Sequence, residues 1–199
     1  AGTLPVVHLI ATNLPEAAMN EAPTLLVPVD LADCTDDIVE RAYRLAEVNG
    51  AKVVLLHVTQ VPEGMASDTL IRRPGSDGTS SAASLLLEEA RPELQRYVAT
   101  LTARGLEAAG RVELGRPVEV ILAVADELGP DLIVMGTHDR TGLNRLLMGS
   151  VADSIKQRAP CPVVTVHSER RPECGATSCA SCDRHVSPVS RALASETDG

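Results

Sequence analysis

The clearest chemistry in this sequence lies in a loop of glycines and small polar residues. The loop starts at Gly136, directly after the apolar run Asp131–Met135, and closes with Gly149 and Ser150, where a helix-like run to Arg158 begins. Glycines let a backbone approach an anion closely, and the free N–H groups at a helix start point toward it. At the end of a parallel-type strand, such a loop indicates phosphate binding, and Ser150 could supply both an N-cap and a hydroxyl. The alternative is that the glycines serve only the strand–loop–helix junction.

A carboxylate follows the first apolar run of the chain. Asp30 stands at the end of the run Thr24–Asp30, and the nearly continuous apolar character of this run is typical of a buried parallel strand. Open α/β sheets bind ligands at the carboxyl ends of their strands, beside the point where the strand order reverses. A carboxylate there can accept a hydrogen bond from an N–H or O–H group of a ligand. The alternative is a structural aspartate that caps the next turn.

Four further residues have a structural role as their simplest interpretation. His57 lies in an apolar strand, where a hydrogen-bonded structural histidine is more common than a catalytic one. Arg72 and Arg73 could reach a phosphate, but a solvated charge pair is the simpler interpretation. Cys161, between two prolines, is expected to be a small apolar core residue.

A second chemical signal lies near the C-terminus, where four residues that can bind metal stand close together: Cys174, Cys179, Cys182 and His185. A Cys-x2-Cys pair places two thiolates on one metal ion, and the outer two residues could complete a tetrahedral Zn²⁺ site. Fe–S ligation and a redox pair between Cys179 and Cys182 are alternatives. A disordered tail whose thiols have no role is a further one.

The composition excludes several classes of function. Phe and Trp are absent and Tyr occurs twice, so we expect a core of Leu, Val, Ile and Ala, and base-stacking nucleic-acid readers are disfavoured. A net charge of -9 also disfavours binding to a phosphate backbone. No apolar run approaches the ~20 residues that span a membrane, the N-terminus has no features of a signal peptide, and five cysteines do not indicate a disulfide framework. We therefore expect a cytoplasmic protein that binds no nucleic acid and inserts into no membrane.

Five short runs predict the strands that place these residues. They are Thr24–Asp30, Lys52–Val58, Arg111–Leu114, Asp131–Met135 and Pro162–Val166. The runs between them have helical periodicity. The resulting order βαβαβαβαβ predicts a parallel sheet with helices on both faces.

Glycine, proline and one aspartate mark the expected helix boundaries. Gly50 and Gly129 stand where helices should end, Pro117 stands in the first turn of one, and Asp33 is the expected N-cap of the first. Pro92 either begins the main helix of its region or kinks a longer one.

Polar stretches divide the chain into three parts. Residues 1–22 form an extension without a clear period, residues 23–168 hold the strands and helices, and residues 169–199 form a polar, Cys-containing tail. Within the middle part, Thr59–Ser81 is rich in Gly, Pro, Ser and Asp and is expected to be a mobile loop.

Three stretches together resemble the universal stress protein family. They are Leu26–Asp30, Leu55–Val58 and the segment from Asp131 through Gly149 and Ser150 to Val164. The resemblance implies an adenine-nucleotide alpha-hydrolase-like fold, which is an open five-stranded parallel sheet of strand order 3-2-1-4-5. It also implies a homodimer, made by pairing the last strands edge to edge.

One branch of this family binds ATP through a loop of pattern G-x2-G-x9-G-[ST]. Here the first glycine is Gly136 and the last pair is Gly149 and Ser150, but Asp139 replaces the second glycine. The resemblance further implies nucleotide contacts at the strand ends and at the helix start, namely at Val29, Asp30, Val58, Met135 and Val151.

Asp139 is the residue on which ATP binding depends. A carboxylate ~4 Å from a phosphate costs about 1 kcal/mol in water and several at lower effective dielectric, and its Cβ blocks close approach of the backbone. Three arrangements would still admit ATP: a side chain turned outward, contact through Mg²⁺, or compensation by His138, Arg140 and Arg145.

These observations favour an adenine-nucleotide-binding regulatory protein of the stress response, which acts as a dimer on an unidentified protein partner. The alternative is a dimeric interaction module that binds no nucleotide and senses metal or redox state through its Cys/His tail. Catalysis ranks last, because no Ser-His-Asp set and no pair of carboxylates for acid–base chemistry can be assembled. Any ATP hydrolysis would be slow and incidental to switching.

Overall fold

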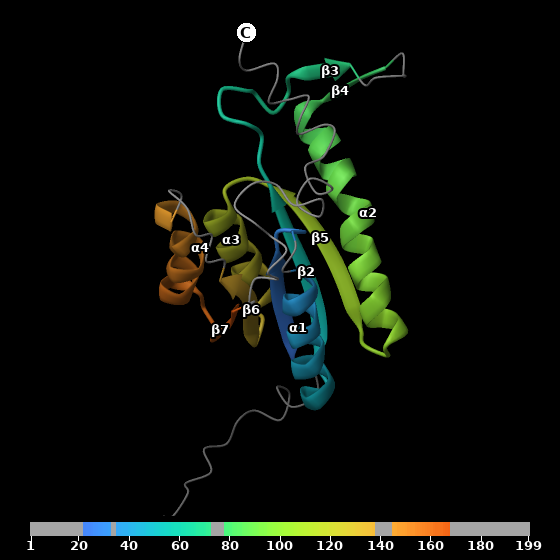
Figure 1. Ribbon diagram of the computed structural model, residues 1–199, viewed down its shortest axis with the longest axis vertical. Helices are drawn as coiled ribbons and strands as arrows, with labels where there is room; N and C mark the ends of the chain where they lie inside the picture. The colour runs from blue at the N-terminus through green and yellow to red at the C-terminus, as the bar shows by residue number, and fades with distance from the viewer. Residues whose placement is uncertain (1–21, 33–34, 73–77, 138–144, 168–199) are drawn as a thin grey trace, which may run out of the picture.

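The computed structural model describes residues 22–32, 35–72, 78–137 and 145–167. Their main element is a five-stranded parallel sheet of order β5-β2-β1-β6-β7 (Figure 1). Its strands are β1 (Thr24–Val29), β2 (Lys52–Thr59), β5 (Ala108–Leu114), β6 (Leu132–Thr137) and β7 (Val163–His167). The predicted fold class and the order 3-2-1-4-5 are confirmed, because β3 and β4 belong to a separate small sheet.

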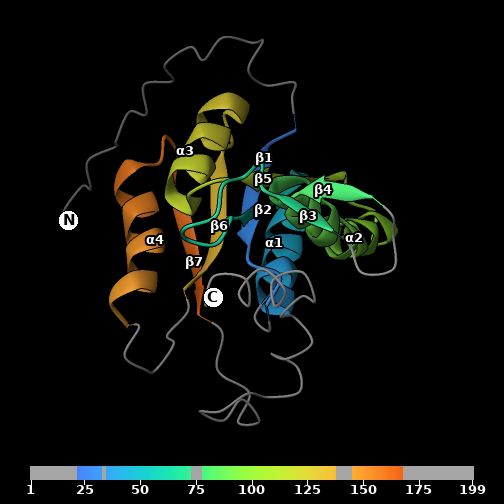
Figure 2. The same ribbon diagram turned by 90° about the horizontal axis from the view of Figure 1, so that it is seen from above.

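Helices cover both faces of the sheet (Figure 2). Among the described residues, α1 (Thr35–Asn49) and α2 (Ala82–Ala103) pack on one face, whereas α3 (Pro117–Leu128) and α4 (Arg145–Arg158) pack on the other. Each face has its own buried core, and both cores are mainly aliphatic. None of the described helices combines the length and the apolar character that crossing a membrane requires.

β1 is buried along its whole length, because helices cover both of its faces. Leu25, Val27 and Val29 face the core beneath α1 and α2, whereas Leu26 faces the core beneath α3 and α4. Alternation of side chains between two dry faces explains why the strand is apolar at successive positions. The predicted first strand is therefore confirmed.

The segment predicted as a mobile loop contains a small hairpin. β3 (Leu70–Arg72) pairs antiparallel with β4 (Thr79–Ser81). These strands are three residues long, and none of their residues is buried. So short a segment carries too little alternation of apolar and polar residues to predict a strand.

α2 is longer than the helix that would begin at Pro92. It starts at Ala82, with Ser81 as its N-cap, and continues through Pro92. The Ser81 Oγ accepts a hydrogen bond from the Ser84 N–H at 3.1 Å. Figure 1 shows the first turns of α2 rising beyond the sheet to the hairpin.

Most of the other helix boundaries match the prediction. Gly50 and Gly129 both have positive φ, of 62° and 56°, and stand at helix ends, and Pro117 is the first residue of α3. α4 begins at Arg145, so the predicted start at Ser150, and with it the N-cap role of Ser150, is wrong. The Leu and Met residues before Gly149 are strong helix formers, and one glycine does not stop such a run.

Three expectations fall on segments without a described structure. Asp33, the expected N-cap of α1, lies outside the described residues. The predicted tail and nearly all of the predicted extension lie outside them as well.

Candidate functional site

The strand order of the sheet reverses beside β1. β2 lies on one side of it and β6 on the other. α1, which follows β1, packs on one face of the sheet, and α4, which follows β6, packs on the opposite face. The two connections diverge, so a crevice is expected outside the carboxyl ends of β1 and β6. Asp30 follows β1 directly, and Gly136 lies near the end of β6.

Backbone pairing between β1 and β6 is short. Among the described residues, β1 pairs with β2 over Thr24–Val29, but its register with β6 covers only Leu25–Leu26. Thr24 turns its backbone toward β6, because its N–H donates to Asp131 Oδ2 at 2.8 Å and its C=O accepts from the Asp131 N–H at 2.9 Å. Backbone groups alternate along a strand, so Pro28 faces β6 too, and it has no N–H to donate. Pro28 thus stands where the ladder between the two strands stops.

The Asp30 carboxylate organises the turn from β1 into α1. Its Oδ1 accepts from the Ala32 N–H at 3.1 Å and from the Thr35 hydroxyl at 3.4 Å. Thr35 is fully buried at the start of α1, whereas Asp30 is exposed. Asp30 therefore caps this turn, which is the structural role expected of it as the alternative to ligand binding. It is compatible with ligand binding, because an ionised carboxylate offers about four acceptor positions.

Leu31, the residue between Asp30 and Ala32, has an unusual backbone conformation. Its φ is 57°, in the left-handed region that side chains other than glycine rarely adopt. Its side chain is 6% exposed and belongs to the core beneath α1 and α2. Burial of the leucine holds the turn in this conformation, and strain of this kind gathers at functional sites. Nothing in the sequence marks Leu31, since leucine is not a residue type that predicts a positive φ.

His57 connects the end of β2 with the end of β1. Its Nδ1 lies 2.9 Å from the Val29 carbonyl oxygen, and since a carbonyl can only accept, Nδ1 carries the proton. Burial has the largest effect on the pKa of His57 and lowers it below the usual 6.5. The hydrogen bond to Val29 and the charges of Asp30 and Glu93 raise the pKa, but by less. The expected hydrogen-bonded structural histidine is confirmed. Val58 follows it, half-buried against the opposite core.

The end of β6 forms the other side of the crevice. Met135 is buried in the core beneath α3 and α4, and Gly136 lies in register with Val166 of β7. The parallel sheet thus brings Met135 and Gly136 to the same edge as Val29, Asp30 and Val58. This is the arrangement that a ligand site across β1 and β6 requires.

The phosphate side of the predicted site is only partly described. Gly149, Ser150 and Val151 lie in α4, and Val151 packs against the same core as Met135. The side chain of Ser150 and the whole of Asp139 lie outside the described part of the chain.

A different helix start is already occupied by the protein itself. At the N-terminus of α2, the Ala82 N–H donates to the Thr69 carbonyl at 2.8 Å, and the Ala83 N–H donates to the Ser67 carbonyl at 3.0 Å. These donors are used, so the start of α2 cannot serve as an anion site. Arg72 lies in the hairpin over this helix start, and Arg73 lies outside the described residues.

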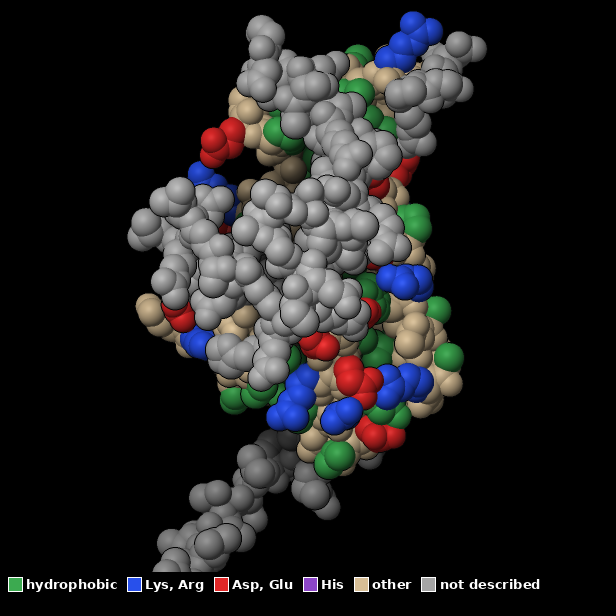
Figure 3. Space-filling view, viewed as in Figure 1, with side chains coloured by type: hydrophobic (Ala, Val, Ile, Leu, Met, Phe, Trp, Pro, Cys, Tyr) green, Lys and Arg blue, Asp and Glu red, His purple; other side chains and the backbone are tan. Residues whose placement is uncertain are grey.

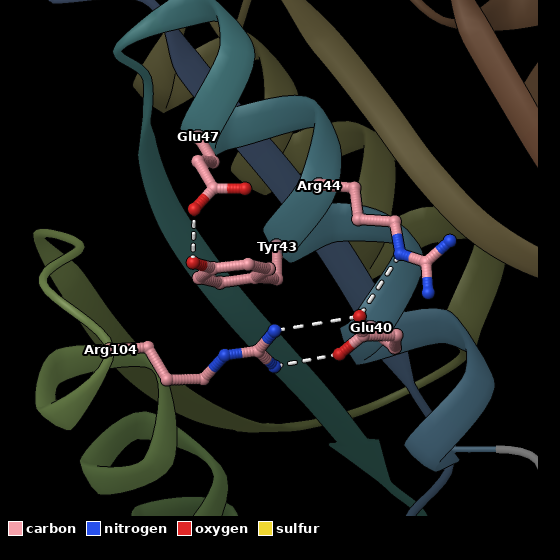
Figure 4. Close-up of polar contacts among 5 residues, drawn as sticks. All are labelled: Glu40, Tyr43, Arg44, Glu47 and Arg104. Atoms are coloured by element: carbon pink, nitrogen blue, oxygen red, sulfur yellow. Dashed lines mark hydrogen bonds and ion pairs between the residues drawn. The ribbon is translucent and has the colours of Figure 1, made fainter.

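A second polar region, the α1–α2 cluster, joins the exposed side of α1 to the C-terminal end of α2 (Figure 4). It consists of Glu40, Tyr43, Arg44, Glu47 and Arg104. Glu40 accepts from the Arg44 Nε at 3.0 Å and from the Arg104 guanidinium at 2.6 and 3.4 Å. The same guanidinium stacks 3.3 Å from the ring centre of Tyr43, whose hydroxyl donates to Glu47. Figure 3 shows positive and negative side chains side by side on this face. The charges of the cluster satisfy one another.

A groove of about 340 Å³ adjoins this cluster. Its lining combines three acidic residues with two arginines, and consists of Asp36, Asp37, Val39, Glu40, Arg96, Tyr97, Thr100 and Arg104. Tyr97 donates its hydroxyl proton to Asp36 at 2.9 Å, and Arg96 pairs with Glu93 at 3.4 Å. The groove therefore presents neither a cationic nor an anionic set for one class of ligand.

The predicted metal site lies outside the described part of the chain. Among the described residues, no three His, Cys, Asp or Glu side chains are grouped so that they could hold a metal ion. The predicted ligands Cys174, Cys179, Cys182 and His185 all lie beyond those residues. Cys161 packs partly buried against the core beneath α3 and α4, and burial raises the pKa of its thiol, as fits a small apolar residue.

The chain is similar to known proteins along most of its described length. The model of the universal stress protein family matches residues 22–167. A universal stress protein of Methanocaldococcus jannaschii is 28% identical over 147 residues, which make up 74% of this chain and 83% of the relative.

Solved structures show the same likeness. A protein of the universal stress protein family from Burkholderia pseudomallei is 27% identical with a TM-score of 0.52, and the match covers 72% of this chain and 95% of that one. The crystal structure of a universal stress protein in complex with cAMP is 23% identical with a TM-score of 0.55, over 74% of this chain and 98% of that one. This chain belongs to the universal stress protein family.

Proposed function

We propose that this protein binds an adenine nucleotide, ATP in the first place, at the carboxyl ends of β1 and β6 and acts as a dimeric regulator in the stress response. The observation that carries the proposal is the Asp30 carboxylate, held by Ala32 and Thr35 at the edge where the β1–β6 ladder has stopped. Such a fixed acceptor suits an adenine amino group or a ribose hydroxyl. The complex of a family member with cAMP supports an adenine ligand on this fold.

The nucleoside would lie against the strand ends. Val58 is half-buried and supplies apolar surface near Asp30. The side chains of Val29 and Met135 are buried in the two cores, so the backbone of these residues would face the nucleoside. The phosphates would follow the segment from Gly136 to Ser150, where Asp139 replaces a glycine. Mg²⁺ between Asp139 and the phosphates is the arrangement that keeps this carboxylate favourable.

Calorimetric titration with ATP tests the site, with and without Mg²⁺, on the parent and on Asp139→Gly. Binding by the parent supports the proposal, and a dependence on Mg²⁺ that the parent has and Asp139→Gly lacks would assign the ion to Asp139. Binding by Asp139→Gly alone would mean that the fold retains the site and that Asp139 closes it. If neither protein binds at millimolar nucleotide, the proposal is wrong.

Asp30→Ala and Glu40→Gln form a matched pair for the same titration. Asp30→Ala should weaken ATP binding about 10- to 100-fold, because it removes a charged acceptor. Glu40→Gln neutralises a carboxylate of the α1–α2 cluster and should leave the affinity unchanged. Equal affinities in both variants would remove Asp30 from the site.

The dimer would form by pairing of β7 with its copy. β7 is an edge strand of the five-stranded sheet, and its residues Val163–Val166 are half-buried. The Ile133 N–H donates to the Pro162 carbonyl at 3.0 Å, so alternation turns the backbone of Thr165 to the free edge. Thr165→Pro removes an outward donor without breaking the ladder to β6.

Light scattering on the parent and on Thr165→Pro tests this dimer. A dimeric parent and a folded, monomeric variant are expected. A dimeric Thr165→Pro would show that another surface joins the copies.

A further inference from the structure

The end of β1 is anchored on one side. Toward β6, Pro28 offers no donor and the register stops at Leu26. Toward β2, the register continues to the pair Val29 and His57. What fixes the last residue of β1 must therefore come from the β2 side.

The His57 side chain provides an anchor at that position. Its Nδ1–H donates to the Val29 carbonyl oxygen at 2.9 Å. This carbonyl belongs to the peptide group that joins Val29 to Asp30. Because a peptide group is planar, a bond that orients its C=O also orients the direction in which the chain enters Asp30.

The turn beyond that peptide group is held by contacts of its own. Asp30 accepts from Ala32 and Thr35, and the buried Leu31 keeps a positive φ. These contacts fix the carboxylate relative to α1, and the His57 bond fixes it relative to β2. A ligand that lies across the sheet edge needs a carboxylate that is fixed relative to both α1 and β2, since a displacement of about 1 Å already weakens a directed hydrogen bond.

We infer that His57 is a positioning residue of the proposed nucleotide site, which orients the Val29–Asp30 peptide group so that the Asp30 carboxylate faces the ligand. The inference depends on the proposed function. His57 acts through Val29 and need not contact the nucleotide.

Two substitutions separate the donor from the rest of the imidazole. In His57→Asn, the side-chain amide can place an N–H near the position of Nδ1. His57→Leu keeps an apolar group of similar size without a donor. Val112→Ala is the matched control, because Val112 of β5 lies in register with His57 and packs against the core beneath α1 and α2. Calorimetric titration with ATP and urea unfolding are measured for all three variants.

His57→Leu should weaken ATP binding about 3- to 10-fold, which is the fold-change that one lost hydrogen bond produces. His57→Asn should restore most of the affinity. Val112→Ala should lose stability while its affinity stays that of the parent, which separates positioning from general loosening of the sheet. Nitrogen-15 NMR of the parent should show the imidazole proton on Nδ1.

Three results would overturn the inference. Parental affinity in His57→Leu would mean that the bond does not matter for binding. Equal losses in His57→Leu and His57→Asn would mean that the donor is not the relevant feature. In both cases the parent still binds, so the proposed function survives. A parent that binds no nucleotide would refute the proposed function itself, and the role of His57 with it.

Discussion

The Asp30 turn and the α1–α2 cluster are two polar regions of the described molecule, and they are built differently. In the turn, formed by Asp30, Leu31, Ala32 and Thr35, one carboxylate is tied to a backbone N–H and to a fully buried hydroxyl. In the cluster, five long side chains pair with one another at the surface. The cluster holds more charge, but flexible exposed pairs fix little geometry.

Because of this difference, a ligand site is expected at the turn and not in the cluster. A fixed acceptor at a sheet edge presents a defined geometry to a ligand, whereas a cluster whose charges neutralise each other would have to be broken first. The turn is held by residues of small or apolar type. Their contacts are seen in the structure, but their residue types give no signal in the sequence that they support a turn. Substitutions in the two regions should therefore have unequal effects.

The largest effect is expected at Leu31. Leu31→Ala removes a 6% exposed side chain from the core and should lower the free energy of unfolding by about 2–4 kcal/mol. Urea unfolding at neutral pH measures it. A loss below about 1 kcal/mol would mean that the leucine does not anchor the turn.

Leu31→Gly makes the comparison sharper. Both substitutions empty the same space, but glycine adopts a φ of 57° without strain, whereas alanine does not. Leu31→Gly should therefore be about 1 kcal/mol more stable than Leu31→Ala. At most positions glycine is the less stable of the two, so the reversed order is the diagnostic result, and the usual order would contradict a strained turn.

A smaller effect is expected at Thr35. Thr35→Val keeps the shape of this fully buried side chain and removes the hydroxyl that donates to Asp30, which should cost about 0.5–1.5 kcal/mol of stability. It should also weaken ATP binding. Thr35→Ser loses a methyl group but keeps the donor, so its stability should fall while its affinity holds. If Thr35→Val binds ATP as tightly as the parent, the Thr35 bond does not serve the site.

The sequence predicted the sheet better than the supports of its site. β1 and β2 were visible because strands covered on both faces must be apolar at successive positions. Gly50 and Gly129 marked helix ends because they adopt the left-handed conformation without strain. Such signals are local, and each depends on the type of one residue or a short run.

The supports of Asp30 depend on contacts that a local pattern does not contain. Leu31 has a positive φ only because a core lies beneath it, and Pro28 ends a ladder only because alternation turns it toward β6. The start of α4 lies at Arg145 and not at the predicted Ser150, because the helix-forming residues before Gly149 outweigh a single glycine. The hydrogen bond from His57 to Val29 joins residues of different strands, and register decides it.

A pH dependence should distinguish His57 from the exposed charges. Its pKa is lowered by burial, so well above pH 6.5 the imidazole is neutral in the folded and the unfolded chain. Below 6.5 the unfolded chain takes up the proton first, and the stability that neutral His57 contributes is lost as the pH falls through the folded pKa. Asp30 and Glu93, which face the imidazole, act against this shift.

The stability difference between the parent and His57→Asn should therefore shrink as the pH is lowered from 7.5 toward 5. Other titrating groups cancel in this difference, because both proteins contain them. Urea unfolding at several pH values measures it. A difference that grows in acid would mean that the folded pKa of His57 is raised instead.

The smallest effect is expected in the α1–α2 cluster. Glu40 accepts from both Arg44 and Arg104, and these bonds lower the pKa of its carboxyl. The side chain of Glu40 is 40% exposed, however, so water replaces much of what Glu40→Gln removes. The loss of stability in Glu40→Gln should be smaller than that in Thr35→Val.

Salt separates the two variants further. In 1 M salt the Debye length is about 3 Å, so the loss in Glu40→Gln should nearly vanish. The loss in Thr35→Val should persist, because a buried neutral hydroxyl is not screened. Urea unfolding of both variants at low and high salt decides the point, since a Glu40→Gln effect that equals Thr35→Val and survives salt would place the structural importance in the cluster rather than in the turn.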